Sequence, residues 1–195
     1  MNESAPAASS APDEATVIAA TRQWLERAVI GLNLCPFARL PYLDQRVCFR
    51  VSRANGSDAV LDDLCGELQS LAAADPADCE TTLLIVPQVF ADFLDFNDFL
   101  DEAEAALEVL GLDGEIQIAS FHPDYRFADS DPDDVENCSN RSPFPILHLL
   151  REASIERALE SIADPDAIFE RNVETLRQLG WEGWKSLWRT RPDGA

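Results

Sequence analysis

The feature that most constrains the fold of this 195-residue chain is an alternation of strand-like and helix-like patterns through its centre. Residues 47–51 alternate apolar and polar side chains, which predicts a half-buried strand, and residues 81–86 are continuously apolar after two threonines, which predicts a strand covered on both faces. Residues 116–121 predict a third strand. Apolar residues at helical spacing predict helices over 57–71 and 92–110. This order is typical of a parallel sheet with right-handed crossovers.

The fold class that follows is α/β, with a small three-stranded, mainly parallel sheet, flanking helices and a helical C-terminal part. An apolar stripe over residues 17–32 predicts a helix before the sheet. Pro143 suits the first position of a helix, so we expect residues 143–151, which are apolar on nearly all sides, to form a buried helix. Further helices are expected over residues 154–162 and 164–179.

Three segments are expected along the chain. Residues 1–15 are rich in Ala, Ser and Pro and lack the basic start and apolar centre of a signal peptide, so they predict a disordered tail. Residues 16–180 are expected to form a single α/β domain. Residues 181–195 contain three tryptophans and predict a C-terminal segment that docks its aromatic rings on the domain.

The formal charge of −21 argues against nucleic acid and anionic membrane surfaces as partners, because both carry negative charge. No apolar run approaches the roughly 18–20 residues needed to span a bilayer. The five cysteines are odd in number, widely spaced and free of any Cys-x-x-Cys pair, which argues against a disulfide framework and a structural zinc site. We therefore expect a reduced, acidic, cytoplasmic protein, and the sequence indicates no particular cofactor or oligomeric state.

The stretch from residue 122 to residue 151 concentrates the polar candidates for a site. His122 directly follows the third predicted strand, at the carboxyl edge where sheets of this kind bind ligands, and His148 lies on the helix predicted over 143–151. The twenty residues between 123 and 142 show no periodicity, which is typical of a functional or a disordered loop. The candidates for substrate contact in this stretch are Tyr125, Arg126, Asn140, Arg141, Ser142 and Arg151.

Four motifs in a fixed order are GLNLCPF at 31–37, FHPDYRF at 121–127, NRSPFP at 140–145 and LHLLRE at 147–152. On these motifs the chain, from about residue 16 to residue 180, resembles a family of short bacterial proteins known only as a domain of unknown function. The resemblance implies that the four motifs form one unit. It implies no substrate, cofactor or catalytic role.

The first hypothesis is a thiol-dependent hydrolase or transferase with Cys35 as the nucleophile. Cys35 lies on a bend after a helix, and either His122 or His148 is the candidate base. Asn33 and Asn140 are candidates to orient the base or to donate to an oxyanion, as is Ser142. Against this, the C-terminal end of a helix disfavours a thiolate, and the alternative is a buried, structural cysteine.

The second hypothesis is a mononuclear metal site formed by His122, His148 and either Cys35 or Asp124. No ligand pair has a recognised helical spacing such as His-x-x-x-His. The interpretation favoured for His148 is therefore a core histidine with satisfied hydrogen bonds, whereas His122 is favoured as a functional residue.

The third hypothesis is a site for a small anion, formed by Arg126, Arg141 and Arg151 beside the helix expected at Pro143. The alternative is a structural unit in which these arginines close the long loop through salt bridges with nearby acids. The acids considered are Asp124, Asp133, Asp134 and Glu152. A non-enzymatic interaction module that uses this unit and the tryptophan segment is a further alternative. Among these we favour a small-molecule enzyme with a Cys, His and Arg site at the carboxyl edge of the sheet.

Overall fold

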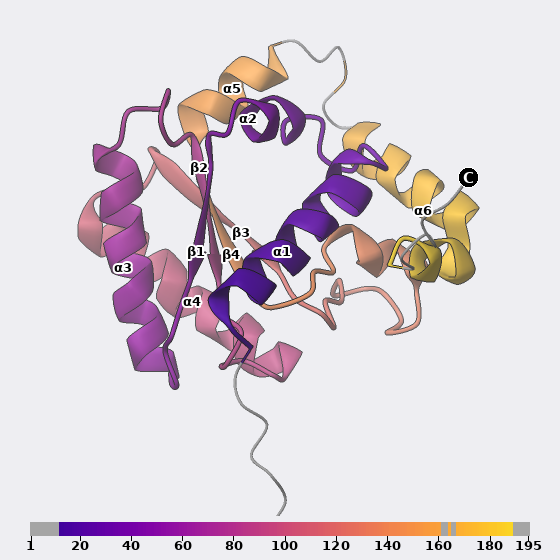
Figure 1. The fold of residues 1–195 in the computed structure, drawn as a ribbon, viewed down its shortest axis with the longest axis horizontal. Helices are drawn as coiled ribbons and strands as arrows, with labels where there is room; N and C mark the ends of the chain where they lie inside the picture. Colours follow the sequence, from indigo (N-terminus) through magenta and orange to yellow (C-terminus); the bar gives the residue numbers. More distant parts are fainter. Residues whose placement is uncertain (1–11, 161–163, 165–166, 189–195) are drawn as a thin grey trace, which may run out of the picture.

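A mixed sheet forms the centre of the molecule (Figure 1). The structure, a computed structural model, describes residues 12–160, 164 and 167–188, and in these residues the sheet has four strands. In spatial order the strands are β1 (Val47–Val51), β2 (Thr81–Ile85), β4 (Ile146–Arg151) and β3 (Ile116–Phe121). β1 and β2 are parallel, while β4 is antiparallel to both β2 and β3. The three predicted strands therefore run in one direction, and the fourth strand opposes them.

The helix predicted over residues 143–151 is wrong, because this segment contains β4. In the sheet, β4 separates β2 from β3, and His148 lies opposite Leu83 on one side and Ala119 on the other. A short apolar run that is covered on both faces looks alike in a buried helix and a central strand, so periodicity alone does not distinguish them. The sheet is accordingly mixed and four-stranded instead of three-stranded and mainly parallel.

Helices cover both faces of the sheet (Figure 1). One face packs against α3 (Ser57–Ala73) and α4 (Phe93–Leu110), which are the predicted crossover helices. The opposite face packs against α1 (Glu14–Trp24) and the π-helical segment η1 (Leu25–Ile30). Successive side chains of a strand point to opposite faces of the sheet, so β2 contributes to both cores. Leu84 belongs to the first core and Leu83 to the second.

The remaining elements lie at the two ends of the strands. The short helices α2 (Arg39–Leu43) and α5 (Glu152–Leu159) lie near the end where β2 begins and β4 finishes (Figure 1). The long loop after β3 contains the 3₁₀ segment η2 (Val135–Ser139), which packs against α6 (Ala167–Ser186). No helix in the described part of the chain is long and apolar enough to cross a bilayer.

The chain ends differ in detail from the expected segments. Asp13 caps α1 by accepting a hydrogen bond from the Thr16 N–H at 3.0 Å, so helix begins within the predicted tail, while residues 1–11 lie outside the described residues. α6 continues past Gly180, whose positive φ of 62° marks a break in the helix. Beyond this break Trp184 is buried in the second core, as expected of a docked aromatic segment. Residues 161–163, 165–166 and 189–195, where parts of the expected segments fall, are also outside the described residues.

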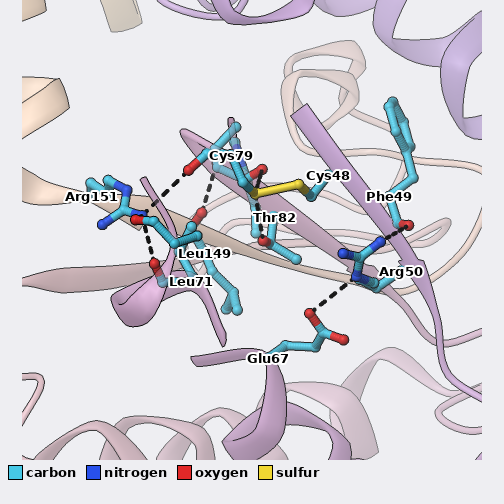
Figure 2. Close-up of a disulfide and its surroundings, with 12 residues drawn as sticks. Cys48, Phe49, Arg50, Glu67, Leu71, Cys79, Thr82, Leu149 and Arg151 are labelled. Atoms are coloured by element: carbon cyan, nitrogen blue, oxygen red, sulfur yellow. Dashed lines mark hydrogen bonds and ion pairs between the residues drawn. A yellow bond between two sulfur atoms is a disulfide. The ribbon is translucent and has the colours of Figure 1, made fainter. Parts of the chain in front are cut away.

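A disulfide joins Cys48 on β1 to Cys79, two residues before β2 (Figure 2). The two Cα atoms are 6.0 Å apart, although the residues are 31 positions apart in sequence. This pairing corrects the expectation drawn from cysteine number and spacing, which carry no information about strands that become neighbours. Cys35, Cys65 and Cys138 are free.

Candidate functional site

His122 is enclosed where β3 ends. Only 1% of the residue is exposed, and the ring lies 5.4 Å from the Phe96 ring, centroid to centroid, in a stacked arrangement. The backbone N–H of Asp124 donates to Nδ1 at 3.0 Å, so Nδ1 is the unprotonated nitrogen. Nε2–H donates to the carbonyl oxygen of Phe90 at 2.9 Å. Both ring nitrogens are therefore occupied, and neither is available for a substrate proton or a metal ion without breaking a buried hydrogen bond.

The long loop after His122 is held by a buried asparagine that sequence reasoning missed. Asn137 is fully buried, and its side-chain oxygen accepts hydrogen bonds from the Phe127 N–H at 3.1 Å and the Ser130 hydroxyl at 2.7 Å. Its amide nitrogen donates to the Asp131 carbonyl at 2.8 Å. A buried amide can satisfy several loop backbone groups in this way, which explains how a segment without periodicity is ordered.

Arg141 holds the same loop. Its Nε donates to the Tyr125 carbonyl at 3.2 Å, and one terminal nitrogen donates to the Pro132 carbonyl at 2.8 Å. The guanidinium also lies over the ring of Trp181, 5.3 Å from its centroid. These contacts support a structural role, but with backbone carbonyls and an aromatic ring as partners in place of the expected carboxylates.

The other candidates near His122 also serve the loop. Asn140 donates its side-chain N–H to the Ser120 carbonyl at 3.2 Å, and its own carbonyl accepts from the His122 N–H at 3.2 Å. The Ser142 hydroxyl donates to the Phe144 carbonyl at 2.5 Å. We call His122, Asn137, Asn140, Arg141 and Ser142 the loop cluster. It joins the FHPDYRF and NRSPFP motifs by hydrogen bonds to backbone groups.

Tyr125 and Arg126 lie beside the loop cluster. The Tyr125 ring is 5.2 Å from that of Phe93 and 5.1 Å from that of Phe127, and burial raises the pKa of its hydroxyl. Arg126 is exposed on the surface. The ring contacts of Tyr125 are with aromatic rings, and Arg126 does not line the pocket that contains Cys35.

Arg151 lies at the far end of β4. One terminal nitrogen donates to the carbonyls of Leu71 and Ala74, at the end of α3, and to that of Cys79, at 2.5, 2.7 and 3.3 Å (Figure 2). Because Arg141 precedes β4 and Arg151 ends it, the two arginines occupy opposite ends of the sheet. The helix expected at Pro143 does not form either, so the structure does not bring Arg141 and Arg151 together beside a helix N-terminus as the anion-site hypothesis expects.

A pocket of about 340 Å³ opens at the end of the sheet where β1 and β2 begin. Its walls are largely apolar and include the side chains of Leu25, Phe37, Leu83, Leu150 and Ile155. Cys35 and His148 both line it. The structure therefore brings together one catalytic pair from the sequence analysis, but at the amino ends of the parallel strands and not at the predicted carboxyl edge.

His148 presents a free ring nitrogen in this region. The Thr81 hydroxyl lies 2.7 Å from Nε2 and donates its single proton to the Leu149 carbonyl at 2.6 Å. Nε2 must then carry the proton and donate to Thr81, which leaves Nδ1 with its lone pair. Nδ1 forms no hydrogen bond with any described residue, and burial lowers the pKa of His148 from 6.5 to about 4. At neutral pH the ring is an uncharged acceptor.

Cys35 is positioned by the bend that follows η1. A side chain at Gly31 would place its Cβ 2.4 Å from the Arg27 carbonyl oxygen, and Asn33 takes a positive φ of 55°. Asn172 of α6 then fixes the bend by donating to the Leu34 carbonyl at 2.8 Å. Asn33, a candidate for substrate contact, is exposed and shapes this turn.

The Cys35 sulfur is a neutral thiol at rest. Burial raises the pKa of Cys35, while hydrogen bonds from the backbone N–H groups of Phe37 and Ala38 act in the opposite direction. The other free cysteines do not line this pocket. Cys138 is fully buried with its pKa raised to about 11, and Cys65 packs against the first core.

Charged residues at the pocket were also missed by sequence reasoning. Arg46, just before β1, is ion-paired with Glu80, just before β2, and Arg157 on α5 lies nearby on the pocket wall. A polar start to an otherwise apolar strand, at Glu80 and Thr81, was the available signal. The described residues contain no group of three or more His, Cys, Asp and Glu side chains suited to a metal ion.

Comparison with known proteins identifies the family. A family model described as a protein of unknown function, DUF1415, matches residues 16–186, which is most of the chain. No curated protein and no solved structure matches the chain. The family predicted from the four motifs, a domain of unknown function, is thus confirmed. The chain belongs to the DUF1415 family.

Proposed function

We propose that this protein is a thiol-dependent enzyme, a hydrolase or a transferase, that acts on a small molecule bound between Cys35 and His148. The observation that carries the proposal is the pocket itself: Cys35 lines it together with His148, whose Nδ1 has no hydrogen bond to a described residue. A nucleophile and a base that share a concave, largely apolar site form the usual core of such an enzyme.

In the proposed reaction the Cys35 sulfur attacks an electrophilic carbonyl carbon. As the C–S bond forms, the π electron pair of the carbonyl moves to its oxygen and the thiol proton passes to Nδ1 of His148. When the carbonyl re-forms, the leaving group departs with its bonding pair and takes the proton from Nδ1. Water or a second acceptor then releases the acyl group from sulfur, which gives hydrolysis or transfer respectively.

Burial of Cys35 and His148 affects the transfer of the thiol proton to Nδ1. It disfavours both a Cys35 thiolate and a His148 imidazolium, so the resting pair is uncharged. Charge separation is favourable only when the substrate accepts the electron pair as the proton leaves. We therefore expect low reactivity toward simple alkylating agents near neutral pH and higher reactivity toward activated acyl compounds that fit the pocket.

Thr81 is a positioning residue in this scheme. Its hydroxyl fixes the tautomer of His148 by accepting from Nε2–H while donating to the Leu149 carbonyl. Without that acceptor the ring would be free to protonate Nδ1 instead, and Nδ1 would then be unable to receive the thiol proton.

The test is acylation by p-nitrophenyl acetate, followed by release of p-nitrophenolate and by mass spectrometry of peptides. We expect one acyl group on Cys35, none in Cys35→Ser, and an unchanged rate in the control Cys65→Ser. His148→Gln should slow acylation by about 10²-fold, and Thr81→Val by a smaller factor, while alkylation of Cys35 at pH 10 stays within twofold. Acylation that persists at the wild-type rate in Cys35→Ser would refute the proposal.

A further inference from the structure

The apolar side chains of the pocket walls and the small volume of the pocket favour a small, apolar ligand. Leu25 of η1, Phe37 of the bend and Ile155 of α5 come from three segments that enclose the space from different sides. The volume of about 340 Å³ lies at the low end of the range of about 300–1,000 Å³ that is common for small-molecule sites. A short hydrocarbon chain or a single ring system fits this description.

The charges around the pocket oppose the charge of the protein. Its charged lining residues are Arg46, Glu80, Arg151 and Arg157, three positive and one negative, whose sum is +2 in a chain of formal charge −21. Arg46 is ion-paired with Glu80, and Arg151 is engaged with backbone carbonyls. The available positive charge therefore lies at Arg157.

Arg157 is exposed on α5, next to Ala158, which lines the pocket with it. Its Nε donates to the Ala153 carbonyl at 3.1 Å and one terminal nitrogen donates to the Ser154 hydroxyl at 3.1 Å. Arg157 forms no ion pair with a carboxylate in the part of the chain that the structure describes. The helix thus holds a guanidinium on the pocket wall with terminal N–H groups left, and such groups bind carboxylates in pairs.

We propose that the pocket selects small amphiphilic carboxylates, with the apolar body between α2 and α5 and the carboxylate at Arg157. This inference deepens the proposed function by naming a substrate class, and it rests on that function only for the identity of the reacting group. A substrate of the proposed enzyme would then contain two groups: a carboxylate that binds Arg157 and a carbonyl carbon that Cys35 attacks. Ligand binding itself needs no reaction.

The test uses full-length Cys35→Ser protein, so that binding is measured without chemistry. Octanoate, octan-1-ol and octylamine are titrated in turn at pH 7.5 and followed by NMR shifts of backbone amides. We expect octanoate to bind at least about fivefold more tightly than octan-1-ol, with shifts at pocket residues and with an affinity that falls as salt rises. Octylamine should bind most weakly.

Arg157→Gln should reduce octanoate affinity about fivefold and leave octan-1-ol affinity unchanged. The matched control is Arg171→Gln on α6, because Arg171 makes the same bond to the carbonyl four residues earlier, Ala167, at 3.3 Å and does not line the pocket. Equal binding of octanoate and octan-1-ol, tighter binding of octylamine, or no binding of any probe at the pocket would overturn the inference. Acylation of Cys35 in the wild-type protein tests the proposed function separately.

Discussion

The two histidines are held in opposite ways at two regions of the molecule. His122 has both ring nitrogens hydrogen-bonded and almost no exposed surface, whereas His148 has one bonded nitrogen and lines a pocket. From the sequence alone, His148 is the histidine expected in the core and His122 the one expected to be functional. The comparison shows that a dense run of polar residues marks the place where the chain most needs internal hydrogen bonds.

The physical reason is the state of the backbone in each region. Residues 123–142 form no strand ladder, so their N–H and C=O groups need side-chain partners, and Asn137 and Arg141 supply them. Around the pocket the strand backbones satisfy one another. A side chain such as His148 is then free to line the pocket.

The largest effect expected from this contrast concerns stability. His122→Ala removes two buried hydrogen bonds and a ring packed among aromatic side chains, so we expect the free energy of unfolding to fall by about 3–4 kcal/mol. His148→Ala should cost less than half as much, because its ring borders an existing space. Urea denaturation of both variants at pH 7.5 measures the difference. Equal losses would remove the distinction between the two regions.

The next effect is the loss of stability at low pH that His148 causes. Burial lowers the pKa of His148 from 6.5 to about 4, so below pH 6.5 the unfolded chain binds a proton that the folded protein resists. Stability from this residue is therefore present above pH 6.5 and is lost as the pH falls toward 4. We expect wild type to lose about 2–3 kcal/mol more than His148→Gln between pH 7 and pH 4.

Urea denaturation at half-unit pH steps would measure this difference, since both proteins share the same carboxylates. An independent check is NMR of the His148 ring, whose titration midpoint should fall well below 6. A midpoint near 6.5, or parallel stability curves for the two proteins, would show that His148 is as hydrated as an ordinary surface histidine.

The smallest of the three effects is expected from a substitution of Arg141, a member of the loop cluster. Arg141→Ala should lower the free energy of unfolding by about 2 kcal/mol, because it removes two charged hydrogen bonds to loop carbonyls and the contact with Trp181. The control Arg126→Ala, at an exposed arginine of the same loop, should stay within about 0.5 kcal/mol. Thermal unfolding compares them, and neither variant should alter acylation of Cys35 at 25 °C.

Local patterns predicted much of the fold and part of the candidate site. The spacing in residues 47–121 predicted the three strands that run in one direction and the helices between them. Cys35 was singled out because Pro36 places it on a bend, and that bend does border the pocket. The register that pairs His148 with Leu83, and brings its Nε2 within 2.7 Å of the Thr81 hydroxyl, was not predictable, since the pattern of residues 146–151 fits a buried helix as well as a central strand.

The sequence by itself determined the α/β class, the order of the elements from β1 to β3 and the membership of the chain in a family of unknown function, because periodicity and motif order are local properties. Only the tertiary structure decided that β4 enters between β2 and β3, that Cys48 meets Cys79, and that Cys35 and His148 share a pocket. Those outcomes depend on which distant segments bury each other's apolar surface. That choice minimises the free energy of the whole chain, and no single stretch of sequence encodes it.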